Sequence, residues 1–191
     1  APERTALATL MWANNEGGTI QPIEEAAAAA AEHGVPFHTD AVQAFGHIPT
    51  QLNNPAITTA TITAHKLGGP VGIGALIVRR AAQLTPHIHG GGQERGMRSG
   101  TADVASAAAF AAAAQAAQDE LAAESERLSQ LRDQLVTAIT ETIPNATVSG
   151  SNDPAQQLPS IVHLSVPGAQ GDSVLFLLDS LGFATSTGSA C

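Results

Sequence analysis

The sequence contains one cysteine, one lysine and no tyrosine among its 191 residues. A single cysteine cannot form an internal disulfide, which excludes a disulfide-stabilised extracellular fold and favours a reducing compartment such as the cytoplasm. Charged residues make up only 13% of the chain, whereas hydrophobic residues make up 43%. A chain of this composition can bury a sizeable core, so we expect a globular protein and not a disordered one.

Basic residues are also scarce, with 8 Lys and Arg against 17 Asp and Glu and a formal net charge of −9. This charge argues against a general binder of nucleic acids or of anionic membranes. The longest apolar stretches are interrupted by Gln, Asp and Glu, so we expect no membrane span. Residues 1–5 lack the basic-then-apolar order of a signal peptide, which again favours the cytoplasm.

The first part of the chain alternates predicted strands with a predicted helix and loops. β-Branched or apolar runs bounded by turn residues predict strands over residues 6–12, 35–40, 57–63 and 72–79. An alanine-rich run that follows a proline predicts a helix over residues 23–32. Strands separated by such crossovers indicate an α/β fold with a sheet that is at least partly parallel.

The pattern changes at Asp103, where a helical stretch begins that continues to Glu141. It is either one long helix or a helix that is kinked or split. After it we expect a strand over residues 161–166, a helix over 172–181 and the start of another strand at 183–186. We therefore assign residues 1–118 to part of a large domain. Residues 119–191 then hold the linking helix and part of a smaller α/β domain.

The only lysine, Lys66, follows a predicted strand and precedes a glycine-rich loop. A lysine beside the hydroxyl of Thr63 and the imidazole of His65 suits a Schiff-base nucleophile next to an anion site. The ordinary alternative is a solvated loop lysine, and spacing alone favours that alternative.

Asp40 ends an otherwise apolar strand, and Gln43 follows three residues later. A carboxylate at such a place either caps a helix or pairs with the pyridinium nitrogen of a pyridoxal phosphate cofactor. Residues 90–101 combine glycines with Arg95 and Arg98, which suits an anion cradle but matches neither a Walker A motif nor a dinucleotide-binding motif. The seven histidines show no zinc-binding spacing, so we expect no metal site.

Five segments together resemble the cysteine desulfurases of the NifS-like group, in the class V aminotransferase superfamily of fold-type I pyridoxal-phosphate enzymes. They are residues 11–16, 38–43, 64–66, 90–101 and 186–191, and they occur in the family order across essentially the whole chain. The only lysine and the only cysteine both fall on the family's catalytic positions. The resemblance implies that residues 1–118 belong to the large domain that binds pyridoxal 5′-phosphate (PLP).

The resemblance also implies a reaction, the conversion of L-cysteine to L-alanine, and a role for each matching residue. Lys66 would bind PLP covalently and move the α-proton of the substrate. Cys191 would take the sulfur and hold it as a persulfide. Asp40 would bind the pyridine nitrogen and Gln43 the phenolic oxygen of PLP, with Asn15 beside that oxygen or the substrate carboxylate.

The remaining implied contacts involve the cofactor phosphate and other proteins. Thr63 and His65 would contact the phosphate, whereas Thr101 would reach the phosphate of the neighbouring subunit's cofactor in a homodimer. Arg95 and Arg98 lie near the active site in this family, and neither receives a fixed role. The sulfur would pass to an acceptor protein, either an iron–sulfur scaffold or a tRNA-thiolation protein.

Parts of the family pattern fall outside this sequence. The upstream phosphate-binding turn and the histidine that stacks on the cofactor ring would precede Ala1, and the arginine that binds the substrate carboxylate would follow Cys191. The chain thus resembles the middle portion of the enzyme. Two alternatives stay open: a catalytically silent, truncated dimerisation or scaffold fragment, and a related aminotransferase or lyase that needs Lys66 and Asp40 but not Cys191.

The loop around Cys191 contains glycine, serine and threonine and no bulky apolar side chain. Its thiol is either buried and inert or mobile and accessible. Because little buried area would hold the loop, we expect poor order over residues 186–191. A mobile loop would let the cysteine collect sulfur at the cofactor and then present it to a partner.

Overall fold

The computed structural model describes residues 2–188, which divide into two compact units. The first unit comprises residues 2–12 and 22–121, and the second comprises residues 13–21 and 122–188. A compact unit is defined by its contacts and not by independent folding, so the domain boundary expected between residues 118 and 119 stays a prediction. No helix within residues 2–188 is long and apolar enough to cross a membrane.

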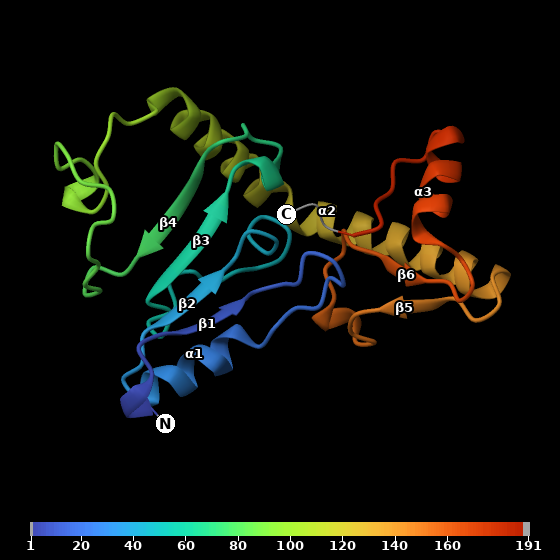
Figure 1. Cartoon of the computed structure of the whole chain (residues 1–191), viewed down its shortest axis with the longest axis horizontal. Coiled ribbons are helices and arrows are strands. Elements are labelled where there is room, and N and C mark those ends of the chain that lie inside the picture. The colour runs from blue at the N-terminus through green and yellow to red at the C-terminus, as the bar shows by residue number, and fades with distance from the viewer. Residues whose placement is uncertain (1, 189–191) are drawn as a thin grey trace. The chain divides into compact units, whose positions relative to one another are not determined.

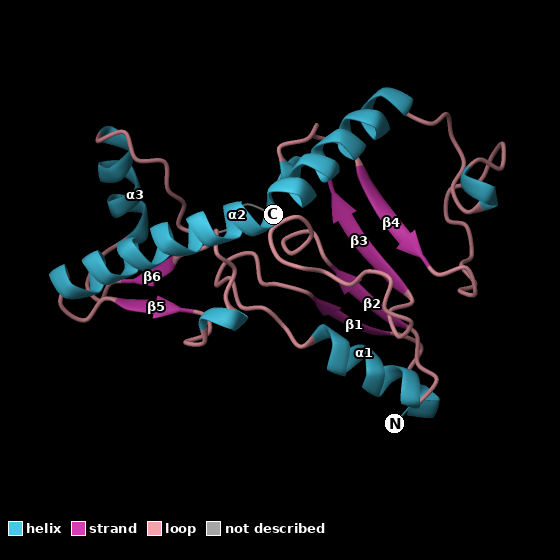
Figure 2. Ribbon diagram, turned by 180° about the vertical axis from the view of Figure 1, so that it is seen from behind, coloured by secondary structure: helices cyan, strands magenta, loops and turns pink. Residues whose placement is uncertain are grey.

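The first unit is built on a four-stranded sheet of order β1-β2-β3-β4. Its strands are β1 (Ala8–Met11), β2 (Phe37–Asp40), β3 (Thr59–Thr63) and β4 (Gly74–Val78). The first three strands are parallel, and β4 runs antiparallel to β3, as the arrows in Figure 2 show. The α/β class and the partly parallel sheet are thus confirmed. The loop between β3 and β4 is too short for a parallel crossover, which explains the reversal.

Helix α1 (Ile23–Glu32) forms the crossover between β1 and β2, over the residues that the sequence predicts. It packs against β2 (Figure 1), and it buries Ile23 and Ala27, which lie one turn apart on the same face. Gly34, at a φ of +67°, follows the helix and takes the left-handed conformation that commonly ends one. In β2, successive side chains point to opposite faces of the sheet, and those of Phe37 and Thr39 are buried.

Helix α2 (Val104–Thr142) contains 39 residues and is a single helix, so the expected long helix is confirmed. Asp103 caps its first turn, because its carboxylate accepts hydrogen bonds from the Ser106 amide at 3.0 Å and the Ser106 hydroxyl at 2.6 Å. These bonds favour the ionised carboxylate and hold the pKa of Asp103 below its ordinary value. In the first unit, the helix buries Phe110.

The second unit contains a small antiparallel pair, β5 (Thr147–Ser149) with β6 (His163–Ser165), followed by α3 (Gly171–Ser180). The expected strand at 161–166 and the expected helix at 172–181 are confirmed as β6 and α3. The strand expected at residues 183–186 is wrong, because these residues form a loop. Phe183 is 60% exposed there, and the segment forms no hydrogen-bonded ladder with any described strand. β propensity alone does not form a strand without a neighbouring strand to pair with. β5 was not predicted.

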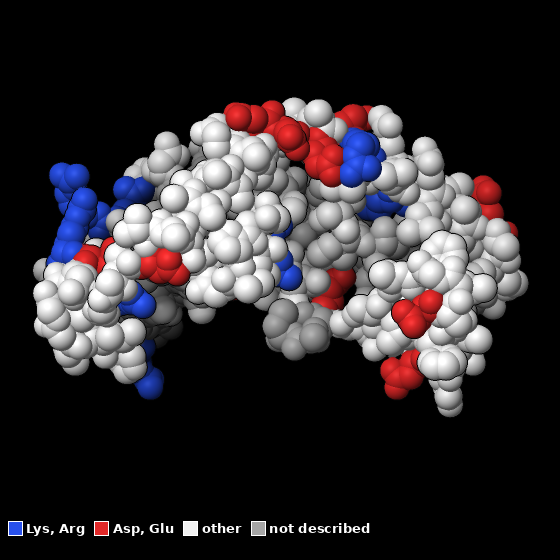
Figure 3. All heavy atoms as spheres, turned by 90° about the horizontal axis from the view of Figure 1, so that it is seen from above, with Lys and Arg blue, Asp and Glu red and all other residues white. Residues whose placement is uncertain are grey.

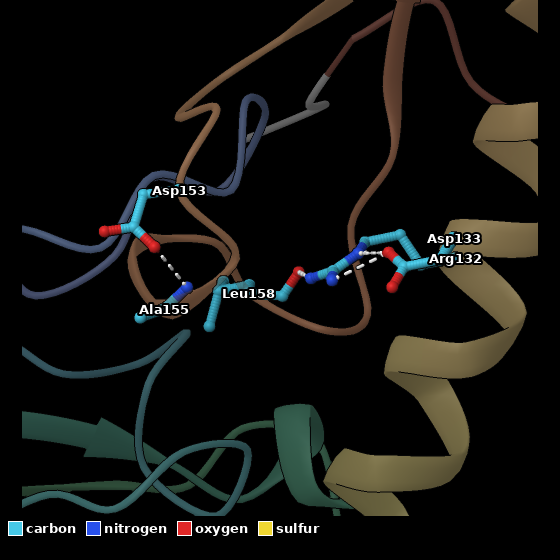
Figure 4. Close-up of polar contacts among 5 residues, drawn as sticks. All are labelled: Arg132, Asp133, Asp153, Ala155 and Leu158. Atoms are coloured by element: carbon cyan, nitrogen blue, oxygen red, sulfur yellow. Dashed lines mark hydrogen bonds and ion pairs between the residues drawn. The ribbon is translucent and has the colours of Figure 1, made fainter.

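Residues 13–21 belong to this second unit because they pair with residues 156–158. The Ile20 amide donates to the Gln156 carbonyl at 2.8 Å, and the Leu158 amide donates to the Gly18 carbonyl at 2.8 Å. Leu158 is fully buried. Its own carbonyl accepts from Arg132 of α2 at 3.4 Å, and Arg132 also pairs with Asp133 at 2.9 Å (Figure 4).

Four short 3-10 turns complete the described fold: η1 (Pro2–Arg4), η2 (His65–Leu67), η3 (Glu94–Gly96) and η4 (Pro154–Gln156). The η4 turn begins at Asp153, whose carboxylate accepts from the Ala155 amide at 2.9 Å (Figure 4). The η2 turn carries Lys66.

Candidate functional site

The carboxyl ends of the three parallel strands meet at one edge of the first unit's sheet. Asp40 is the last residue of β2 and is in register with Met11, the last residue of β1, and with Thr61 of β3. Thr63 is the last residue of β3, and η2 follows after one residue. Side chains at this edge of a parallel sheet commonly bind ligands. Asp40 and the Thr63–Lys66 segment are therefore brought to the same edge.

The Asp40 carboxylate is exposed at this edge. Its Oδ1 accepts a hydrogen bond from the Val42 amide at 2.9 Å, and its carbonyl accepts from the Trp12 amide at 2.7 Å. The backbone bond fixes the end of β2 against the end of β1. The side-chain bond occupies one carboxylate oxygen, and a carboxylate retains acceptor capacity beyond one such bond. The same carboxylate can therefore stabilise its turn and bind a ligand N–H.

Lys66 is half-buried in the η2 turn, which is closed by backbone bonds. The amides of Leu67 and Gly69 both donate to the Ala64 carbonyl, at 2.9 and 3.0 Å. Gly68 ends the turn with a φ of +74°, a left-handed conformation that glycine adopts without steric cost. Gly68, two residues after Lys66, is thus favoured by the shape of the turn.

Thr63 and His65 form a hydrogen-bonded pair beside Lys66. The Thr63 hydroxyl donates to the Ile73 carbonyl at 3.1 Å, and the Thr63 Oγ1 lies 3.0 Å from His65 Nδ1. The tautomer of His65 decides which atom of the 3.0 Å contact donates. A ring with its proton on Nε2 can accept from Thr63 at Nδ1 and donate to an anion at Nε2.

The glycine-rich segment 90–101 belongs to the first unit and contains hydrogen bonds between its own residues. Buried Ser99 accepts from the Gly92 amide at 3.2 Å, and the Gln93 side chain accepts from the Gly100 amide at 3.0 Å. Thr101 is exposed, as are the two arginines of the segment. The role of Thr101 toward a partner subunit stays a prediction.

Asn15 lies in the second unit, in a turn that follows β1 in the chain. Asn14 holds this turn together, because its Oδ1 accepts from the amides of Glu16 at 3.0 Å and Gly17 at 2.7 Å. Asn15 itself is half-buried. Cys191 lies outside the described residues 2–188, as do residues 189 and 190, so the order expected for the 186–191 loop stays a prediction.

Two contacts of the candidate site were missed by sequence reasoning. Gln43 is half-buried on the turn after Asp40, and His47 on the same turn contacts the backbone of Lys66. His47 Nε2 lies 2.9 Å from the Lys66 carbonyl oxygen. The second is Gln157, whose amide donates to the Gly17 carbonyl at 2.8 Å and so holds the Asn14 turn. Neither residue belongs to a sequence pattern that indicates its partner.

Charged side chains are sparse over much of the face drawn in Figure 3, in keeping with the low charged fraction. Within residues 2–188, no three His, Cys, Asp or Glu side chains gather in a way that could hold a metal ion. The donors at the sheet edge are instead one carboxylate, one amine, one hydroxyl and one imidazole. The amine, the hydroxyl and the imidazole can bind an organic anion, and the carboxylate can accept from a ligand N–H.

Comparison with known proteins identifies the family. The sequence profile of the aminotransferase class V family matches residues 2–191. The chain belongs to this family. It is 48% identical over 186 residues to an IscS-like cysteine desulfurase of Mycobacterium tuberculosis and 42% identical over 186 residues to the cysteine desulfurase NifS of Azotobacter vinelandii. Each alignment covers 97% of this class V chain, and 47% and 46% of the two relatives respectively.

Solved structures agree with this assignment. A NifS-like protein from Rickettsia africae superposes with a TM-score of 0.89 at 33% identity, over 96% of this chain and 50% of that one. DndA from Streptomyces lividans superposes with a TM-score of 0.82 at 34% identity, over 95% and 51% of the two chains. The resemblance to NifS-like cysteine desulfurases is thus confirmed, and the class V chain spans about half the length of the relatives it matches.

Proposed function

We propose that this chain is part of a PLP-dependent cysteine desulfurase, which converts L-cysteine to L-alanine and transfers the sulfur to a cysteine of the enzyme as a persulfide. The observation that carries the proposal is the placement of Asp40 and the Lys66 turn at the same carboxyl edge of three parallel strands. The curated relatives named cysteine desulfurase support the reaction. The alternatives, a silent fragment or a related aminotransferase, are outcomes of the tests below.

The donor chemistry at the sheet edge fits PLP. The cofactor requires an acceptor for its ring nitrogen, an amine for its aldehyde and donors for its phosphate. Asp40 provides an exposed carboxylate, Lys66 the amine, and Thr63 and His65 a hydroxyl and an imidazole. The loop beside them offers further room, since a Cβ added to Gly68 would meet no atom within 4 Å.

Each of these residues would have one task. Asp40 would bind the protonated ring nitrogen, and bound PLP then supplies an electron sink for the electrons released at the substrate α-carbon. Lys66 would hold the cofactor and afterwards carry the α-proton on its amine. The His65 imidazole would bind the phosphate, with Thr63 fixing its ring through the 3.0 Å contact. Gln43 would bind the phenolic oxygen.

The sulfur-transfer step would use Cys191. Its thiolate would attack the sulfur of the bound cysteine, so that a sulfur–sulfur bond forms as the substrate's carbon–sulfur bond breaks. The electron pair of the broken bond would stay with the carbon fragment, which takes up a proton and leaves as alanine. Asn15 would bind the substrate carboxylate or the phenolic oxygen. These two assignments come from the resemblance.

The same proposal extends to partners and location. The enzyme would be a homodimer, with Thr101 binding the phosphate of the other subunit's cofactor. Its persulfide would supply an iron–sulfur scaffold protein, in iron–sulfur cluster assembly, or a tRNA-thiolation protein. We place the enzyme in the cytoplasm, where a single cysteine stays reduced until it is used.

The full-length protein offers a direct test of the proposal. After incubation with PLP and reduction with borohydride, we expect pyridoxyl phosphate on the peptide that contains Lys66, the only lysine of this chain. The variant Lys66→Ala should lose this label and all alanine formation from cysteine, while Arg80→Ala, an exposed cation of the same unit, should retain both. Normal turnover by Lys66→Ala would refute the assignment, and absence of any label in the wild type would favour a silent fragment.

A second variant separates the desulfurase from an aminotransferase. Cys191→Ser should abolish persulfide formation and alanine release while leaving the label on Lys66 in place. An aminotransferase would be indifferent to this change.

A further inference from the structure

His47 contacts the candidate catalytic turn without belonging to any motif of the sequence. Its Nε2 lies 2.9 Å from the carbonyl oxygen of Lys66, and both residues are half-buried. Carbonyls in the last turn of a short helix have no partner within the helix, and a side chain commonly bonds them. Because a carbonyl only accepts, His47 must carry a proton on Nε2 to make this bond.

The segment that holds His47 is itself fixed to the sheet. The Ala41 amide, directly after Asp40, donates to the Thr61 carbonyl of β3 at 2.9 Å. Two steps of helical turn follow, in which the Ala44 amide donates to the Ala41 carbonyl at 3.1 Å and the His47 amide donates to the Ala44 carbonyl at 3.0 Å. Residues 41–47 therefore form a hydrogen-bonded bridge from the end of β2 to the Lys66 turn.

Packing at Gly46 fixes the other side of this bridge. Its φ is +79°, and a Cβ there would lie 2.5 Å from Leu67 Cδ2 and 3.1 Å from the Ala117 Cβ. The backbone at residue 46 is thus in close contact with both η2 and α2, which leaves no space for a side chain. The hydrogen bond from His47 and the contact of Gly46 hold η2 at two adjacent points.

We infer that His47 is a positioning residue, which sets the place of Lys66 relative to Asp40 through the Lys66 carbonyl. The inference rests on the proposed function, because that function gives Lys66 and Asp40 their roles at opposite ends of one cofactor. Without the bond, the carbonyl loses its side-chain donor, and the contact at Gly46 is what remains between residues 41–47 and η2. The Lys66 amine then samples more positions, and capture of a bound aldehyde slows because it depends on alignment.

The test uses the full-length protein and three variants. His47→Ala removes the donor, and His47→Gln places an amide N–H at a similar reach. His33→Ala is the control, since His33 is exposed at the end of α1. The rate at which added PLP labels Lys66, measured by borohydride quenching and peptide mass, should fall roughly five- to ten-fold in His47→Ala. It should return to within about two-fold of wild type in His47→Gln and stay unchanged in His33→Ala.

A second readout requires neither cofactor nor activity. In the cofactor-free protein at neutral pH, the ¹⁵N resonance of His47 Nε2 should be that of a protonated ring nitrogen. An unprotonated Nε2, or equal labelling rates in His47→Ala and wild type, would overturn the inference. Slow labelling of Lys66 in His47→Gln would also overturn the inference, because a donor at this position would then not restore the rate. If the wild type shows no label on Lys66, the proposed function fails, while the resonance still decides whether the hydrogen bond exists.

Discussion

Gly150 provides a quantitative test of how the turn that carries Asn15 is held. Its φ is +110°, and a Cβ at this position would lie 2.4 Å from the carbonyl oxygen of Gly17 and 2.5 Å from Gln157 Oε1. The first of these atoms belongs to the backbone, so it cannot rotate away as the end of a long side chain can. Replacement by alanine must therefore strain residue 150 or displace the turn.

The cost of Gly150→Ala follows from these two effects. An alanine held at this φ costs about 1–3 kcal/mol. Relief of the overlap by displacement of neighbouring atoms costs about 1–3 kcal/mol more. The displacement also weakens the 2.8 Å bond from Gln157 to the Gly17 carbonyl. We therefore expect the turn to lose about 2–6 kcal/mol of local stability.

Gly168→Ala is a matched control in the same unit. Gly168 has a φ of +81°, but a Cβ there would meet no atom within 4 Å. The control thus carries a comparable backbone strain, about 1–2 kcal/mol, without the overlap and away from the turn. A difference in the stability of the turn between the two variants therefore reports the overlap of the new Cβ at residue 150 with the Gly17 carbonyl and Gln157.

Hydrogen exchange in the full-length protein measures the effect locally. The amides of Glu16, Gly17 and Gly18 all donate to Asn14, so their protection reports whether the turn is closed. A loss of 2 kcal/mol corresponds to a fall in protection of about 30-fold, which we expect in Gly150→Ala. In Gly168→Ala these amides should change by less than about three-fold. Equal protection in the two variants would refute the reasoning.

Two further predictions concern the first unit. Asp103→Ala should lower the thermal midpoint at pH 7, because it removes the hydrogen bonds to Ser106. These bonds lower the pKa of Asp103 in the folded state, so the stabilisation is complete above the unfolded-state pKa near 3.9 and is lost as the pH falls. The difference in thermal midpoint between wild type and variant should therefore shrink below about pH 4. A difference that stays constant with pH would contradict this. Arg79→Lys should lower the free energy of unfolding in urea by about 1–3 kcal/mol, since Arg79 bonds three backbone carbonyls of the segment before β3, whereas Arg80→Lys should have no effect. Equal urea midpoints for Arg79→Lys and Arg80→Lys would contradict the stabilising role of Arg79.

Much of the first unit could be predicted from the sequence because its signals are local. The alanine run of α1 and the length of α2 follow from helix propensity and from hydrogen bonds within one turn. The strands follow from short apolar or β-branched runs between turn residues. Asp40 ends one of these strands and Lys66 follows the next, so the parallel arrangement of β2 and β3 brings both to a shared edge.

Local signals also explain the two errors in the second unit. Residues 183–186 contain apolar and β-branched side chains, yet a strand exists only where another strand offers its backbone, and none of the described strands does so here. The three residues of β5 are too few to show an alternation, and their pairing with β6 depends on the chain returning to them. Strand formation in this unit is therefore a property of the pair and not of the segment.

Only the tertiary structure determined which backbone groups the side chains of His47 and Gln157 bond. The first bond joins residues 19 apart and the second joins residues 140 apart. Both donors satisfy carbonyls in turns, and no periodicity or propensity encodes which carbonyl a distant side chain will reach. Composition and motif predict the chemistry at Asp40 and Lys66. How firmly the Lys66 turn and the Asn15 turn are held depends on bonds that exist only once the whole chain has packed.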